Sequence, residues 1–149
     1  MEERLGKQLS WATKAAHAHF DEGLSSIGSS FHTYVVLLHV ELYPGVSQRE
    51  LARHLGIEGP TLTHHLDRLT ADGLVERVRG RDDRRTSSAV LTTKGRAHLR
   101  KAVSFANQLD AEFRSLFSNS ELQSLRGYLQ RIIDHYGRTD VDVDRAHTG

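Results

Sequence analysis

Residues 47–73 constrain the fold more than any other part of the chain, because they predict two short helices joined by a tight turn. Ser47 and Glu50 have the spacing of a capping box, in which each side chain accepts a backbone N–H of the other. Gly56 suits the left-handed turn that follows a helix, and Pro60 suits the start of the next helix, where its missing N–H costs nothing. Together these signals predict a helix-turn-helix.

A β-hairpin is predicted directly after this unit. Residues 74–78 and 87–91 are rich in β-branched side chains and flank a charged turn around Gly80. Two strands alone are only marginally stable, so we expect the hairpin to pack against the neighbouring helices as a wing. The fold class that follows is mainly α with a small β-hairpin wing (α+β).

Longer helices are predicted on both sides of the winged helix-turn-helix. Apolar residues recur at helical spacing over residues 5–24, 31–42, 93–117 and 118–136. The stripes on the first and last helices are longer than a small winged module can bury, which favours a homodimer of intertwined terminal helices. The alternative is that these helices fold back on their own chain.

The chain is expected to be one protomer over residues 1–149, with no separate catalytic domain. We divide it into a DNA-binding lobe, a helical dimerisation region and a flexible tail. These correspond to residues 30–92, to residues 1–29 with 93–136, and to residues 137–149. The tail is assigned from its polar sequence, which lacks an apolar packing face.

Charge is distributed unevenly along a chain whose net charge is only +1. Residues 47–100 contain 11 Lys and Arg against 7 Asp and Glu, a local charge of +4. A basic stripe of this kind fits a surface that faces phosphates, although a solvated charged hairpin would give the same composition. The chain lacks the apolar core of a signal peptide and any run of about 18–20 apolar residues, so we expect a cytoplasmic protein without a membrane span.

The sequence offers no motif for catalysis, and we predict neither an enzyme nor a cofactor. It has no cysteine, no G-x-S-x-G and no phosphate-binding glycine loop. Ten histidines invite a metal site, but the pairs His17/His19 and His64/His65 are too close in sequence to face one another on a helix. We therefore predict no metal site, and keep a regulator that responds to metal or pH through histidines of different helices as an alternative.

The order of these parts resembles the MarR family of bacterial transcription regulators. The resemblance extends over about residues 5–136 and is most specific in SQRELARHLGI (residues 47–57), TLTHHLDRLTADGLVER (61–77) and DRRTSSAVLTTKG (83–95). It implies a dimeric winged helix-turn-helix protein, usually a repressor, that binds an inverted-repeat operator and is often released by a small phenolic or other aromatic ligand. A winged-helix module that only binds another protein is the remaining alternative.

The predicted DNA contacts come from three segments. A recognition helix places its first half in the major groove, where Thr61, Thr63, His64 and His65 would be the exposed residues. Ser47, Gln48 and Arg68 are predicted to meet phosphates. The resemblance implies that Arg85 of the wing enters the minor groove with Asp83 as its support, and Arg81 and Arg84 are predicted phosphate partners.

Two regulatory features are also expected. An imidazole in water titrates near pH 6.5, so mild acid would add positive charge beside DNA at His64. This position often carries arginine in the family that the chain resembles. A ligand pocket is expected between the dimer helices and the DNA-binding lobe. Its candidate lining residues are Trp11, Phe20, His39 and Tyr43.

Overall fold

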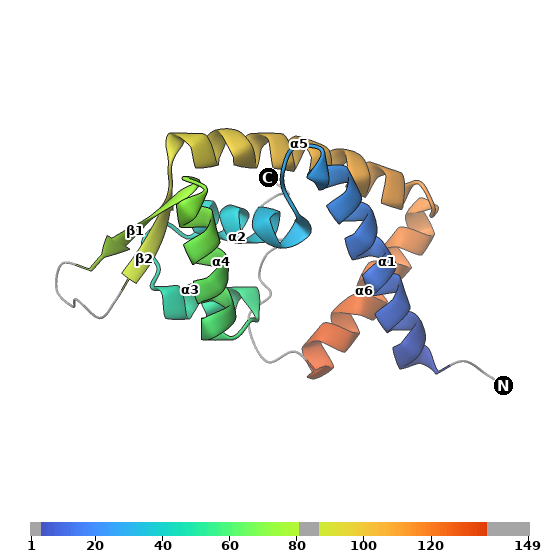
Figure 1. Ribbon diagram of the computed structural model, residues 1–149. Helices are drawn as coiled ribbons and strands as arrows, with labels where there is room; N and C mark the ends of the chain where they lie inside the picture. Colours follow the sequence, from blue (N-terminus) through green and yellow to red (C-terminus); the bar gives the residue numbers. More distant parts are fainter. Residues whose placement is uncertain (1–3, 81–86, 137–149) are drawn as a thin grey trace.

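The computed structural model describes residues 4–80 and 87–136, and within them it contains six helices and one two-stranded hairpin (Figure 1). The elements in chain order are α1 (Leu5–Ser25), α2 (Phe31–Leu42), α3 (Gln48–Leu55), α4 (Gly59–Ala71), β1 (Val75–Arg79), β2 (Ser87–Leu91), α5 (Thr93–Arg114) and α6 (Asn119–Tyr136). The mainly α fold with a β-hairpin wing is therefore confirmed.

The boundaries of α3 and α4 follow local signals that the sequence carries. The capping box is present, since the Ser47 hydroxyl accepts the Glu50 N–H and the Glu50 carboxylate accepts the Ser47 N–H. Gly56 ends α3 with φ of 63°, a left-handed conformation that favours glycine. Pro60 lies in the first turn of α4, where no helical partner for an N–H is needed. These predictions are confirmed.

The end of α5 is a correction to the sequence analysis. We expected this helix to continue to about residue 117, but it ends at Arg114. The N–H groups of Leu116 and Phe117 donate to carbonyls three residues earlier, which tightens the chain into a turn before α6. The apolar stripe does not mark the end of the helix, because it continues to Leu116, whose side chain is 70% exposed.

The hairpin pairs β1 with β2 in antiparallel register, with Val75 opposite Leu91 and Arg77 opposite Ala89. Val75, Ala89 and Leu91 are buried, so the root of the hairpin packs on the helices while its outer part extends away from them (Figure 1). An isolated bridge between Ser47 and Ser88 also joins the hairpin to the start of α3. This arrangement is the predicted wing.

One hydrophobic core lies under the helix-turn-helix and the hairpin. It is formed by apolar residues of α2, α3, α4, both strands and the first half of α5. Three leucines at helical spacing form the inner face of α4, since Leu62, Leu66 and Leu69 are at most 2% exposed. At about 1.5–3 kcal/mol for each fully buried leucine, these side chains hold the opposite face of α4 toward solvent.

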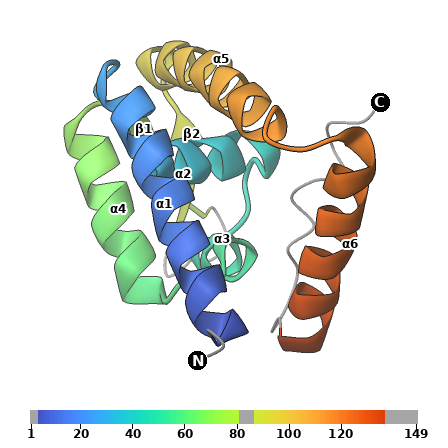
Figure 2. The ribbon, with the colours of Figure 1, turned by 90° about the vertical axis from the view of Figure 1, so that its right-hand side faces the viewer.

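The last helix is arranged differently from the others. No residue of α6 is buried, and Figure 2 shows this helix standing to one side of the remaining elements. Ser118 caps it, because its hydroxyl accepts the Glu121 N–H and its own N–H donates to the Glu121 carboxylate. No helix among the described residues has the length and apolar character to cross a bilayer.

Candidate nucleic-acid interface

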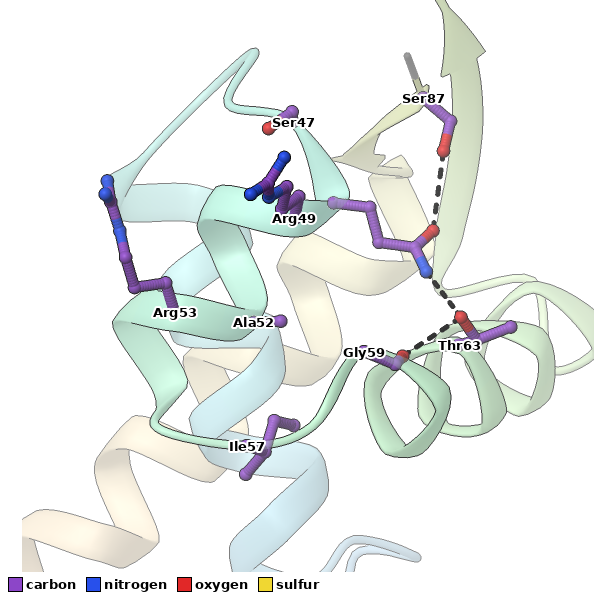
Figure 3. A pocket seen from close by; sticks show the side chains of 9 residues that line it. Ser47, Arg49, Ala52, Arg53, Ile57, Gly59, Thr63 and Ser87 are labelled. Carbon is purple, nitrogen blue, oxygen red and sulfur yellow. Dashed lines mark hydrogen bonds between the residues drawn. The ribbon is translucent and has the colours of Figure 1, made fainter. Parts of the chain in front are cut away.

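A surface groove of about 770 Å³ lies where α3, the start of α4 and the start of β2 meet (Figure 3). It is lined by Ser47, Gln48, Arg49, Ala52, Arg53, Ile57, Gly59, Thr63 and Ser87. The groove shows that the helix-turn-helix and the wing share one face of the molecule. That shared face is what a winged helix needs if its helix and its wing are to reach adjacent grooves of one duplex.

Gln48, Thr63 and Ser87 form a hydrogen-bonded network across this groove. The Gln48 Nε2 donates to the Thr63 Oγ1 at 2.6 Å, and the Gln48 Oε1 accepts from the Ser87 Oγ at 3.4 Å. The Thr63 hydroxyl in turn donates to the Gly59 carbonyl at 3.1 Å (Figure 3). The first residue of α3 thus ties the recognition helix to the first residue of β2. Gln48 and Thr63 were both predicted to contact DNA, and the bond between them was not predicted from the sequence.

The start of α3 carries a fixed negative charge. The Ser47 hydroxyl and then the Ser47 N–H lower the pKa of Glu50, because both donate to its carboxylate. The carboxylate therefore stays ionised at the helix terminus where Ser47 and Gln48 were expected to meet a phosphate. A phosphate at this terminus has to bind beside that charge, and the predicted contact stays a prediction.

The four predicted base-reading residues of α4 differ in how exposed their side chains are. Thr61 and His64 are exposed, as expected. Thr63 and His65 are only half-exposed, which corrects the expectation that all four side chains lie free on the outer face. The physical reason is that Thr63 is turned toward Gln48, whereas His65 is turned toward α2.

His65 stacks on His32 of α2, with ring centroids 5.9 Å apart and an interplanar angle of 9°. Desolvation lowers the pKa of His65, and the charges of His32, Arg68 and His64 lower it further. Arg68, a predicted phosphate partner, donates to the Thr33 hydroxyl of α2 at 3.2 Å. The recognition helix is therefore attached to the start of α2 by one ring stack and one hydrogen bond.

His17 of α1 extends this group, since its ring centroid lies 6.2 Å from that of His32. Residues that sequence spacing keeps apart, His17, His32 and His65, are thus brought together by three different helices. Among residues 4–80 and 87–136, no group of three or more His, Asp or Glu side chains is arranged to hold a metal ion.

Two arginines of α3 belong to this face and were not singled out from the sequence. Arg49 and Arg53 are exposed, line the groove and lie one turn apart. The signal that could have identified them is their spacing, since Arg49 lies within the capping box and Arg53 follows it four residues later on the same helix. Arg77 of β1 is engaged differently, because it pairs with Asp67 at 3.0 Å and donates to the Thr63 carbonyl at 3.3 Å. The predicted wing residues Arg81, Asp83, Arg84 and Arg85 lie outside the described residues.

The four candidate ligand-binding residues fall into separate ring contacts within the protomer, and their role in ligand binding stays a prediction. His39 is 2% exposed and lies 5.9 Å from the ring of Tyr43. The ring of Phe20 instead packs on that of Phe31, with ring centroids 5.7 Å apart. Trp11 is half exposed on α1, and the ammonium group of Lys7 lies over its ring. In the described part of the chain, no ring contact joins either of them to His39 or Tyr43. A second groove, of about 640 Å³ between α2 and α5, is lined by none of the four.

Comparisons with known proteins agree with this geometry. A family model described as the MarR family matches residues 27–86. The chain is 31% identical to the transcriptional repressor CouR, solved on a 23-mer DNA duplex, with a TM-score of 0.81 over 87% of this chain and 92% of CouR. It is 25% identical to a mutant of MarR from E. coli solved with operator DNA, with a TM-score of 0.82 over 87% of this chain and 93% of that one.

A third similar structure is the organohalide-sensing regulator RdhR in its 2,4-dichlorophenol-bound form. Its TM-score is 0.82 over 89% of this chain and 79% of RdhR, at 17% identity. At that identity the similarity concerns the fold alone.

Proposed function

We propose that this protein is a homodimeric repressor of an inverted-repeat operator. The proposal starts from its family, because the chain belongs to the MarR family of DNA-binding transcription regulators. Proteins of this family regulate transcription and are not enzymes. The observation that carries the proposal is the common face of α3, α4 and the wing around the groove of Figure 3. A repressor of chromosomal genes would act in the cytoplasm.

In the proposed complex, the first half of α4 lies in the major groove. Thr61 and His64 are the exposed side chains of this half and reach the bases, and the half-buried Thr63 and His65 lie beside them on the same helix. The proposed phosphate partners are Ser47, Gln48 and Arg68, which were predicted from the sequence. Arg49 and Arg53, which line the groove, are added to them. Arg85, supported by Asp83, enters the minor groove, and Arg81 and Arg84 meet phosphates.

The second protomer is proposed to cover the terminal helices. Large apolar side chains are exposed on α1, at the end of α5 and along α6, namely Leu5, Leu9, Trp11, Phe113, Leu116, Tyr128, Leu129, Ile133 and Tyr136. A helix without any buried residue cannot be stable on packing within this chain, so α6 needs a partner surface. We assign dimerisation to residues 1–29 and 93–136, and DNA binding to residues 30–92.

Release by a small aromatic ligand is part of the proposal. It is supported by the contact between the buried ring of His39 and the half-buried ring of Tyr43. Regulation by pH is a second candidate, favoured by the contacts among His17, His32 and His65. The two are separated by measuring operator affinity against aromatic ligands and against pH.

The experiment that tests the function is selection of bound DNA from random sequence, followed by affinity measurements at several salt concentrations. We expect an inverted repeat whose half-site centres lie about 10–10.5 base pairs apart, and affinity that falls as salt displaces phosphate contacts. An Ile133→Asp variant should sediment as a monomer and lose most of this affinity. Wild-type protein that sediments as a monomer and binds no DNA at low salt would instead support the module that only binds protein.

A further inference from the structure

The hydrogen bonds of Thr63 limit how this residue can read DNA. A threonine hydroxyl has one proton to donate and two lone pairs to accept with. In the structure its proton is given to the Gly59 carbonyl, and one lone pair accepts the Gln48 side chain at 2.6 Å. The hydroxyl cannot donate to a base acceptor without giving up the bond to Gly59.

The methyl group of Thr63, unlike its hydroxyl, is not engaged by these hydrogen bonds. Figure 3 shows the hydroxyl turned toward Gly59 and the methyl carbon pointing away from it. Thr63 is also only half-buried, so part of the side chain is accessible from the shared face of α3, α4 and the wing. The part left for recognition is therefore apolar. In the major groove, only thymine offers an apolar group, its 5-methyl.

Gln48 fixes this orientation. Its Nε2 holds the Thr63 hydroxyl, and its Oε1 accepts from Ser87 of the wing. Without Gln48, one of the two contacts that define the Thr63 rotamer is lost, and the hydroxyl can rotate toward the duplex. Apart from its proposed phosphate contact, Gln48 therefore influences base recognition through Thr63.

We propose that Thr63 determines specificity by packing its methyl group on the 5-methyl of a thymine, and that Gln48 is the positioning residue that holds it there. The inference rests on the proposed DNA-binding function and adds the base that one residue selects. Removing one buried methyl group corresponds to roughly a three- to fivefold change in affinity. Removal from both half-sites of a symmetric operator corresponds to about a 15-fold change.

The test replaces each thymine of the selected operator in turn by deoxyuridine, which lacks only the 5-methyl group, symmetrically in both half-sites. The wild type should lose about 15-fold at one thymine. Thr63→Val has methyl groups at both γ positions and a single preferred rotamer in a helix, so it presents a methyl without the hydroxyl bonds and should show the same loss. Thr63→Ser has no methyl and should bind both duplexes equally. Thr70→Ser is the matched control, because Thr70 makes the same type of bond to a carbonyl four residues earlier at the far end of α4. It should behave as the wild type does.

Gln48→Ala should reduce the deoxyuridine effect without lowering the melting temperature, a result that a purely structural role would not give. The proposal is overturned if no thymine distinguishes wild type from Thr63→Ser, or if Thr63→Val behaves like Thr63→Ser. An unchanged deoxyuridine effect in Gln48→Ala overturns the positioning role. Failure of the proposed function itself gives a different result, because no operator would be selected in the first step.

Discussion

Substitution of Gly95 by alanine should destabilise the root of the wing. Gly95 is buried near the start of α5, where its N–H donates to the Thr92 hydroxyl. A Cβ atom at this position would lie 1.9 Å from the Leu74 carbonyl oxygen and 2.9 Å from the Leu74 carbonyl carbon. To reach even a 3.0 Å contact, the two backbones must separate by about 1.1 Å.

The cost follows from the bonds that this separation strains. The Leu74 carbonyl accepts the Thr92 N–H at 3.1 Å and the Thr92 hydroxyl at 3.3 Å. The Thr92 hydroxyl also donates to the Gly73 carbonyl at 2.7 Å, so its single proton is shared and the bond to Leu74 is the weaker one. Loss of the two contacts with Leu74 costs about 1–2 kcal/mol in total. Overpacking adds about 1–3 kcal/mol, and the higher helix propensity of alanine returns about 1 kcal/mol. The expected net loss in the free energy of unfolding is about 1–4 kcal/mol.

Equilibrium urea denaturation, followed by circular dichroism at one protein concentration, measures this loss. Gly127→Ala in α6 is the matched control, since nothing lies within 4 Å of a Cβ atom there and the position is opposite the apolar stripe of that helix. It should stabilise the protein by about 0.5–1 kcal/mol. The reasoning is refuted if Gly95→Ala is as stable as the wild type. Because Leu74 leads directly into β1, Gly95→Ala should also weaken operator binding.

Three further predictions concern single side chains. Arg85→Ala should weaken operator binding by roughly 1–3 kcal/mol, measured by fluorescence anisotropy, and unchanged affinity would exclude the minor-groove contact. Operator binding should be tighter at pH 6 than at pH 8 because an imidazolium in place of imidazole at His64 would add positive charge beside the duplex, and a His64→Gln variant that keeps the full pH dependence would disprove this. Burial lowers the pKa of His39 chiefly by desolvation, against the opposing bond to the Val35 carbonyl. The unfolded chain therefore takes up a proton below about pH 6.5 that the folded chain resists, and stability should fall between pH 7 and 5. His39→Phe should lose less stability over this range in urea titrations, and equal losses would contradict the assignment.

The parts of the fold that were predictable are those set by neighbouring residues. The capping box at Ser47 and the left-handed turn at Gly56 need only a few residues to form, and both are present. The predicted end of α5 was wrong because it was placed from the spacing of apolar residues. Leu116 continues the stripe, but it is 70% exposed, so its spacing does not reflect packing within this chain.

The candidate site was less predictable than the fold, because its side chains are engaged by residues distant in sequence. Helical spacing correctly placed Thr63 outside the leucine face of α4, but it could not show that Gln48, 15 residues earlier, already holds the hydroxyl. His65 likewise stacks on His32, from a different helix. Spacing reports which face of a helix a residue occupies. It does not report which other element lies against that face.

Helix α2 links the first terminal helix, α1, to the recognition helix, α4. In the described part of the chain, α1 packs mainly on α5 and α2, whereas α4 packs mainly on α3, β1 and α2. The element that they share is α2. At its start, Asp21 of α1 accepts the Phe31 N–H at 2.7 Å, while His32 and Thr33 contact His65 and Arg68 of α4. A displacement of α1 relative to the recognition helix must therefore strain these contacts at the first turn of α2. They depend on polar and aromatic side chains without helical periodicity, which is why the junction emerges from the structure and not from the sequence pattern.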